Sequence, residues 1–200
     1  MHVVRIGEDN GRTALLVDGV VQSISPDAGL TTGGYWAAMV PQDQQPRRAL
    51  FLGLGGGTVA RLLQARWGDE VQMVGVEDDP GVIETARAVG WLPLPGLELV
   101  VEDAFAYVWR CADRFDYIAL DLFRADELVR QELSRPFLRR LRDLLEPSGE
   151  LAVNLFRDRR RASRLHRIEQ VFDIRRVVEQ GGNVIVHARR RGGQRRAPRA

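Results

Sequence analysis

From residue 49 to residue 156 the sequence alternates between two patterns, and this alternation limits the possible folds more than any other feature. Short apolar runs typical of strands are each followed by a segment with helical spacing of apolar residues. The strand patterns cover 49–52, 71–77, 97–101, 115–120 and 150–156, and the helical patterns cover 58–67, 80–86, 104–110, 135–145 and 159–171. Such alternation predicts an α/β fold in which helices cover both faces of a mostly parallel sheet.

Strand patterns also flank this region on both sides. Before it, three short β-branched runs cover 3–6, 13–17 and 20–24, and Asp18–Gly19 between the last two is a hairpin signal. After it, the runs 174–179 and 183–188 predict a terminal antiparallel pair across Gly181–Gly182. We therefore expect an N-terminal β-hairpin region at 1–45, an α/β domain at 46–190 and a basic, disordered tail at 191–200.

Composition excludes several classes of protein. The chain has 200 residues, of which 44% are hydrophobic and 28% charged, and no apolar run reaches the length of a membrane span. Its start lacks the pattern of a signal peptide. A single cysteine, Cys111, excludes an internal disulfide and a cysteine-rich metal site. We expect a cytoplasmic protein that needs no membrane and no metal.

Charge is distributed unevenly along the chain, and every basic residue is an arginine. Residues 1–134 hold 11 Arg against 20 Asp and Glu, whereas residues 135–200 hold 18 Arg against 7 Asp and Glu. Such asymmetry can indicate a surface for nucleic acid. A solvated helix face with a basic tail explains it as well, and aromatic residues are not interleaved with the arginines as in a single-strand-binding groove. Nucleic acid is therefore a partner that we do not favour.

A glycine-rich loop, Leu52–Gly57, lies between the first strand and the first helix of the alternation. Gly53, Gly55 and Gly57 allow a sharp turn and a close approach of the backbone to a ligand. Glu77 ends the next strand about 20 residues later, where a carboxylate can accept hydrogen bonds from both ribose hydroxyls of an adenosine ligand. The loop and the acid together predict a nucleoside site.

Two further acids end the following strands. Asp103, followed by Ala104, ends the third strand, where it can bind an adenine amino group or serve as the N-cap of the next helix. Asp121 ends the fourth strand. Because the carboxyl ends of parallel strands face one crevice, we expect these side chains to converge with Glu77. A nicotinamide dinucleotide is not favoured, since Thr58 stands where that fingerprint has its third glycine.

With these residues the sequence resembles the spermidine synthase family, the polyamine aminopropyltransferases. The matching elements are 17–22 (VDGVVQ), Tyr35, the glycine loop, the VEDDP stretch at 76–80, Asp103 and Asp121. The resemblance implies a class I S-adenosylmethionine-dependent methyltransferase fold with a seven-stranded sheet. It implies that S-adenosylmethionine or its decarboxylated form is bound, that Gln22 and Tyr35 line the acceptor side, and that Asp121 is the general base. It also implies a small amine acceptor and a homodimer.

The sequence departs from the family's pattern at two acids. Gly56 stands where the family has an aspartate that holds the donor's amino group, and Arg124 stands where it has a second aspartate beyond the base. Arg124 could bind a substrate carboxylate instead. Two alternatives to aminopropyl transfer therefore remain open. One is a methyltransferase acting on a small molecule or RNA, and the other is a nucleoside-binding domain without catalysis.

Overall fold

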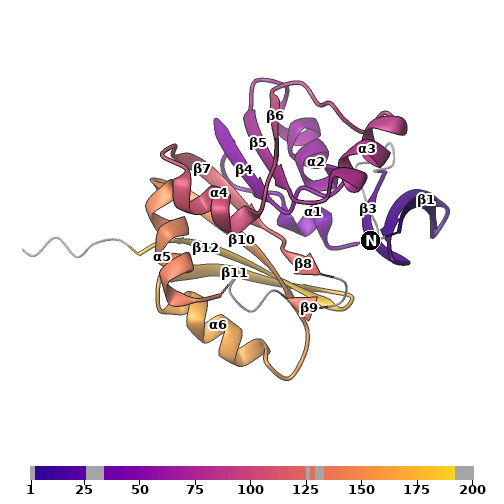
Figure 1. Cartoon of the computed structure of the whole chain (residues 1–200). Coiled ribbons are helices and arrows are strands. Elements are labelled where there is room, and N and C mark those ends of the chain that lie inside the picture. Colours follow the sequence, from indigo (N-terminus) through magenta and orange to yellow (C-terminus); the bar gives the residue numbers. More distant parts are fainter. Residues whose placement is uncertain (1–2, 26–33, 125–126, 129–132, 192–200) are drawn as a thin grey trace, which may run out of the picture.

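The central element is a seven-stranded sheet with strand order β11-β12-β10-β7-β4-β5-β6 (Figure 1). The computed structural model describes residues 3–25, 34–124, 127–128 and 133–191, with backbone only at 124, 127 and 128. Strand β12 pairs antiparallel with both of its neighbours, and the other pairs are parallel. The predicted α/β fold with a mostly parallel seven-stranded sheet is therefore confirmed.

The helices and strands follow the alternation that the sequence predicts. The strands of the sheet are β4 (Arg48–Leu52), β5 (Gln72–Glu77), β6 (Leu97–Val101), β7 (Phe115–Leu120), β10 (Leu145–Phe156), β11 (Phe172–Gln180) and β12 (Asn183–Arg190). The helices are α1 (Trp36–Met39), α2 (Thr58–Trp67), α3 (Pro80–Ala88), α4 (Ala104–Arg110), α5 (Arg135–Leu144) and α6 (Arg161–Glu169). The short strands β8 (Phe123–Arg124) and β9 (Glu127–Leu128) form a separate pair.

Alternate residues of the strands build two cores, one on each face of the sheet. Leu50 and Leu52 of β4 belong to the core that α4, α5 and α6 cover. Ala49 and Phe51, which point the other way, belong to the core that α1, α2 and α3 cover. The helices lie on the two sides of the sheet in Figure 1. Because both faces are buried at the centre of the sheet, β4 and β7 are mostly apolar, as expected of parallel strands.

Helix α6 is shorter than the predicted range of 159–171. Asp158 accepts a hydrogen bond from the Arg160 amide at 2.9 Å through its side chain and from the Arg161 amide at 3.0 Å through its carbonyl oxygen. This turn occupies the first residues of the predicted range, so the helix begins at Arg161. At the other end the Val171 amide donates to the Ile168 carbonyl oxygen at 3.0 Å in a tighter turn, and the helix ends at Glu169.

The N-terminal region is a three-stranded antiparallel sheet rather than a simple hairpin. Its strands β1 (Val4–Asp9), β2 (Arg12–Val17) and β3 (Val20–Ile24) follow one another in order. The predicted turn between β2 and β3 is confirmed, with positive φ at Asp18 and Gly19 (51° and 85°). The third strand arises because β1 pairs with the edge of β2 that faces away from β3.

The N-terminal sheet is fixed to the glycine loop by buried hydrogen bonds. The Thr58 hydroxyl donates to the Ile24 carbonyl oxygen at 2.9 Å and accepts from the Ile24 amide at 3.1 Å. The Ser23 hydroxyl accepts from the Gly56 amide at 2.7 Å. Ser23 and Thr58 are each only 1% exposed, so water does not compete for these bonds. The end of β3 therefore has a fixed position against the start of α2.

Within the described part of the chain no helix is long and apolar enough to cross a membrane. Of the predicted tail at 191–200, residues 192–200 lie outside the described residues. The division of the chain at residue 45 stays a prediction.

Thr58→Val should weaken the attachment of the N-terminal sheet. The variant removes both partners of the buried Ile24 backbone groups, so we expect the free energy of unfolding to fall by about 2 kcal/mol. Hydrogen exchange should speed up in residues 20–24. Urea unfolding and exchange measured by mass spectrometry test this. Thr13→Val, at an exposed position of β2, is the matched control and should change stability by less than about 0.5 kcal/mol. Equal effects of the two variants would contradict the expectation.

Candidate active site

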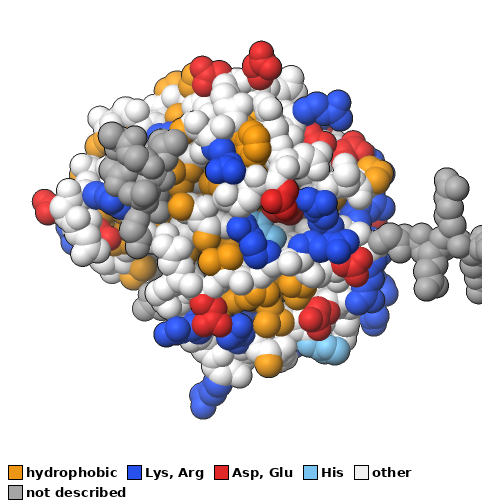
Figure 2. Space-filling model, turned by 180° about the vertical axis from the view of Figure 1, so that it is seen from behind, with side chains coloured by type: hydrophobic (Ala, Val, Ile, Leu, Met, Phe, Trp, Pro, Cys, Tyr) orange, Lys and Arg blue, Asp and Glu red, His pale blue; other side chains and the backbone are white. Residues whose placement is uncertain are grey.

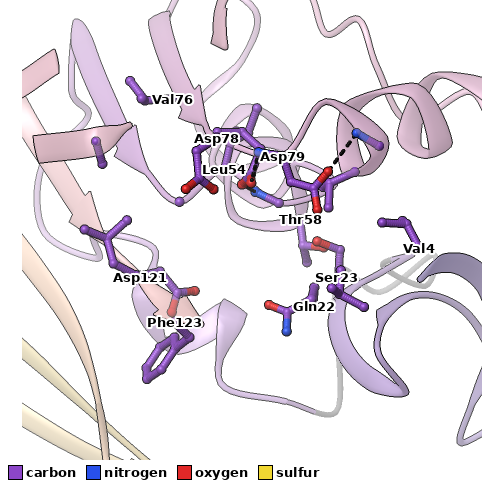
Figure 3. A pocket seen from close by; sticks show the side chains of 18 of the residues that line it. Val4, Gln22, Ser23, Leu54, Thr58, Val76, Asp78, Asp79, Asp121 and Phe123 are labelled. Carbon is purple, nitrogen blue, oxygen red and sulfur yellow. Dashed lines mark hydrogen bonds between the residues drawn. The ribbon is translucent and has the colours of Figure 1, made fainter. Parts of the chain in front are cut away.

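A pocket of about 1150 Å³ opens at the carboxyl ends of β4, β5, β6 and β7, beside the N-terminal sheet. Of the residues predicted for the site, Gly53, Gly55, Glu77, Asp103, Ala104, Asp121, Gln22 and Tyr35 all line it. Figure 3 shows Asp121 and Phe123 on one side and Gln22 and Ser23 on the other, with Asp78 and Asp79 between them. The topology therefore brings together side chains that are up to about a hundred residues apart in the sequence. This agrees with the rule that open α/β sheets bind ligands at the carboxyl ends of their strands.

The glycine loop lies directly against the backbone of Asp121. Gly53 has a φ of 82°, and a Cβ added there would lie 2.2 Å from the Asp121 carbonyl oxygen. No side chain fits at that distance, so this position requires glycine for both its conformation and its contact. Gly57 also has positive φ (82°) but is the N-cap of α2 and does not line the pocket. Its role is to begin the helix.

Every amide of the loop from Gly53 to Gly57 donates to an acceptor within the protein. The first two donate to the Val76 carbonyl oxygen at 3.0 Å, and the Gly57 amide donates to the Leu54 carbonyl oxygen. The Gly55 amide donates to Glu77 Oε2 at 2.8 Å, and the Gly56 amide donates to the Ser23 hydroxyl oxygen. A phosphate-binding loop needs amides that face the ligand. This loop therefore offers no cradle for a phosphate or a carboxylate.

Glu77 lines the pocket next to the loop. Its Oε2 accepts from the Gly55 amide and its Oε1 accepts from the Asp79 amide at 3.2 Å. Burial raises the pKa of Glu77 to about 7, against the effect of these two hydrogen bonds. Each carboxylate oxygen has a second lone pair, so both can also accept from a ligand hydroxyl.

Asp103 and Ala104 form the part of the pocket wall at the end of β6. The Asp103 side chain accepts from the Ala106 amide at 2.9 Å, which confirms the predicted N-cap of α4. Asp103 also lines the pocket, so the capping role is compatible with a ligand contact. Ala104 is buried and closes the wall beneath it.

Asp121 is held from two sides by neutral donors. The Tyr35 hydroxyl donates to Oδ2 at 2.8 Å, and the Asn154 side-chain amide donates to Oδ1 at 2.8 Å. Burial raises the pKa of Asp121 to about 6, while the hydrogen bonds from Asn154 and Tyr35 lower it. A carboxylate with such a pKa is mostly ionised at neutral pH and can accept a proton there.

The sequence did not reveal Ser23, which lines the pocket, or Asn154, which supports Asp121 from outside it. Both are buried polar side chains, 1% and 0% exposed, in strands whose other residues are mostly apolar. A polar residue inside an apolar strand is a signal that it has a specific partner. The sequence contains that signal for both residues, although it does not identify the partners.

The part of the pocket predicted to take the acceptor combines aromatic and polar groups. Tyr35 stacks on Trp36 with 4.7 Å between ring centroids, and both line the pocket. Gln22 extends from β3 toward Asp121 (Figure 3). The side chain of Arg124, predicted to bind substrate, lies outside the described residues. Among the described residues no group of three or more His, Cys, Asp or Glu is arranged to hold a metal ion.

The space beside Gly56 is already filled. A Cβ at this position would lie 2.9 Å from the Trp91 ring and 3.0 Å from the Ser23 Cβ. The guanidinium of Arg61 lies over the Trp91 ring, 5.0 Å from its centroid, and donates to the Gly56 carbonyl oxygen at 3.2 Å. The structure therefore has no room for an aspartate here without movement of Ser23 or Trp91.

Gly53→Ala tests whether the close approach of the loop to Asp121 governs the site. The new methyl group would clash with the Asp121 carbonyl oxygen, so we expect a loss of about 3 kcal/mol or more in the free energy of unfolding. Gly11→Ala is the matched control, because Gly11 has a similar φ of 76° with nothing within 4 Å. It should cost only about 1 kcal/mol. Chemical denaturation of both variants gives the difference, and similar losses would mean that the contact is not restrictive.

Comparison with curated proteins finds polyamine aminopropyltransferases. The protein from Chromobacterium violaceum is 32% identical over 170 residues, which are 82% of this chain and 64% of that protein. The chain thus spans less than two thirds of that relative's length. No protein-family model matches the chain.

Solved structures with the same fold include both spermidine synthases and methyltransferases. A probable spermidine synthase from Corynebacterium glutamicum superposes with a TM-score of 0.78 at 22% identity, covering 94% of this chain and 77% of its own. Human methyltransferase-like protein 13, solved with SAH, superposes with a TM-score of 0.64 at 23% identity and covers 76% of each chain. The chain is therefore similar in sequence to the polyamine aminopropyltransferases, and it has the Rossmann-like fold that spermidine synthases share with methyltransferases.

Proposed function

We propose that this protein is a spermidine-synthase-like transferase that moves an aminopropyl group from decarboxylated S-adenosylmethionine to a small amine. The observation that carries this proposal is the position of Asp121. Its carboxylate, oriented by Tyr35 and Asn154, lines the same pocket as Glu77 and Asp103. A general base thus stands beside a nucleoside site, which is the arrangement that transfer to an amine requires.

The donor's nucleoside fits the end of the pocket near β5 and β6. The two oxygens of Glu77 can accept the ribose hydroxyls while keeping their bonds to the Gly55 and Asp79 amides. Asp103 can accept from the adenine amino group, with Ala104 against the ring. Each of these contacts needs only an acceptor or an apolar surface from the protein.

The charge of the pocket supports a cationic donor and a cationic acceptor. Seven acidic residues line it: Glu77, Asp78, Asp79, Glu84, Glu102, Asp103 and Asp121. Glu102 is paired with Arg110, and among the described side chains no Arg or His lines the pocket. The glycine-loop amides are also occupied. A carboxylate on the donor would therefore have no cationic partner among the described side chains, whereas a sulfonium and an ammonium would be stabilised.

The chemistry follows from these positions. The neutral amine nitrogen attacks the aminopropyl carbon bound to the sulfonium, a C–N bond forms, and the C–S bond breaks with its electron pair going to sulfur. The nucleoside leaves as a neutral thioether, and the proton of the new ammonium passes to Asp121. Such a reaction depends mainly on holding the two reactants in line. Tyr35 and Asn154 contribute by fixing the base.

Nucleic acid as an acceptor receives less support from the surface. On the rear face of the molecule, arginine side chains are interspersed with acidic and hydrophobic ones (Figure 2). Several arginines of the C-terminal third form ion pairs, among them Arg161 with Glu179 and Arg164 with Asp158. Paired arginines contribute less to binding a phosphate backbone than free ones. A homodimer stays a prediction from the family resemblance.

Calorimetric titration with the decarboxylated and the intact donor tests the proposal directly. We expect the decarboxylated form to bind more tightly by roughly tenfold or more, because the pocket gives a carboxylate no described partner. Transfer to simple mono- and diamines should then be detectable by mass spectrometry. Tighter binding of the intact donor would favour methyl transfer. If neither form binds, the transferase proposal fails.

Asp121→Asn should abolish transfer and leave donor binding within a few-fold of the wild type. The variant keeps the shape of the side chain but cannot accept a proton. In the wild type, turnover should fall as the pH drops through about 6, because protonated Asp121 is no longer a base. Turnover measured against pH, with donor binding measured by calorimetry, tests both statements. Undiminished turnover in the variant would remove Asp121 from the mechanism.

A further inference from the structure

A chain of two partly buried hydrogen bonds joins the terminal hairpin to Asp121. Asn183, the first residue of β12, donates from Nδ2 to Asn154 Oδ1 at 3.0 Å. Asn154 in turn donates from Nδ2 to Asp121 Oδ1 at 2.8 Å. Asn154 is fully buried, and neither asparagine lines the pocket. The chain of bonds therefore reaches the base from behind and does not touch the ligand space.

The chemistry of the three groups determines the direction of each bond. An ionised carboxylate can only accept, so Asn154 must turn its amino group toward Asp121. Its carbonyl oxygen then faces the opposite way and needs a donor. Asn183 supplies that donor, which gives the buried amide a partner on both sides. If Asn154 were reversed, its oxygen would face the carboxylate, and both asparagines would lose their bonds.

The order of the strands explains why these residues meet. Strand β10 lies between β7, which leads into Asp121, and β12. Asn154 is paired with Ile185, and Asn183 is paired with Phe156, so the two asparagines lie close together at one end of the β10–β12 ladder. Asn183 directly follows the Gly181–Gly182 turn. The terminal hairpin thus brings a side chain to the same edge of the sheet at which the pocket opens.

We propose that Asn154, locked in orientation by Asn183, is a positioning residue for Asp121 that fixes its carboxylate in the direction of the attacking amine. The catalytic meaning of this statement rests on the proposed function, in which Asp121 takes the proton. Tyr35 holds the second oxygen from α1, so the carboxylate has one donor on each side. Its rotation is restricted by two different parts of the fold.

The same hydrogen bond affects the ionisation of the base. The groups that face Asp121 are Tyr35 from α1 and Asn154 from β10, with Tyr117 nearby on β7 and Glu77 across the pocket. Both hydrogen bonds lower the pKa of Asp121, against the effect of burial. Loss of the Asn154 amide should therefore raise it further. A residue that only filled space would have no such effect.

Asn154→Leu tests the proposal with a side chain of similar size and no amide. We expect turnover to fall roughly tenfold or more at pH 7, with the KM for the donor within about twofold. The acidic limb of the pH profile should move up by about one unit. Asn183 contacts neither the base nor the pocket, so Asn183→Ala should shift the acidic limb of the pH profile in the same direction but by a smaller amount. Gln180→Ala is the matched control, because Gln180 is paired with Asn183 across the hairpin. It should leave the profile unchanged.

A second measurement keeps the proposal testable without turnover. The protonation of Asp121 in the ligand-free protein can be followed by infrared titration, with its carboxyl band assigned by its loss in Asp121→Asn. The band should titrate at higher pH in Asn154→Leu than in the wild type. If Asn154→Leu does not fold, Asn183→Ala is measured instead, and the same direction of shift is expected. An unchanged titration in folded variants overturns the proposal. A shifted titration in a protein that transfers nothing would sustain the positioning role and refute the proposed function.

Discussion

The backbone contact between the glycine loop and Asp121 determines the geometry of the whole site. The Asp121 amide donates to the Leu52 carbonyl oxygen at 2.9 Å, and the Gly53 Cα lies where any Cβ would meet the Asp121 carbonyl oxygen. These contacts join the end of β4 to the end of β7. In the proposed mechanism the loop borders the nucleoside and Asp121 is the base, so main-chain atoms would fix the distance between donor and base. The side chains of Tyr35 and Asn154 then influence only the orientation and the ionisation of the Asp121 carboxylate.

The remaining parts of the site are attached around this contact. The N-terminal sheet holds the loop through Ser23 and Thr58, and Tyr35, the N-cap of α1, donates to Asp121. This attachment has an electrostatic consequence. Once the loop amides are bonded within the protein, the helix start of α2 no longer presents them to an anion, and the acids at the strand ends dominate the potential of the pocket. The same type of glycine loop that binds phosphate in other folds here borders a pocket lined by seven acidic residues.

The fold was largely predictable because its signals are local. Apolar periodicity, Pro80 at a helix start and glycines after strands each report on a few consecutive residues, and the ranges of α2 and α4 agree with the prediction. The convergence of Glu77 and Asp121 followed from the topology, since parallel strands end at one edge. Helix α6 was predicted too long because Asp158 bonds to the backbone before the helix, a competition that periodicity does not report.

The partners of buried polar side chains were not predictable, because they are distant in sequence. The structure describes four such residues, Ser23, Thr58, Asn154 and His187. The first three contact the glycine loop, its anchor on β3 or the base, across separations of 33 or 34 residues. His187 lies 2.7 Å from the Ala38 carbonyl oxygen in α1, the helix that follows Tyr35. Burial of a polar group is costly unless it is bonded, so each one fixes an element that carries a site residue. A polar residue inside an apolar strand therefore indicates, in this fold, a contact behind the active site.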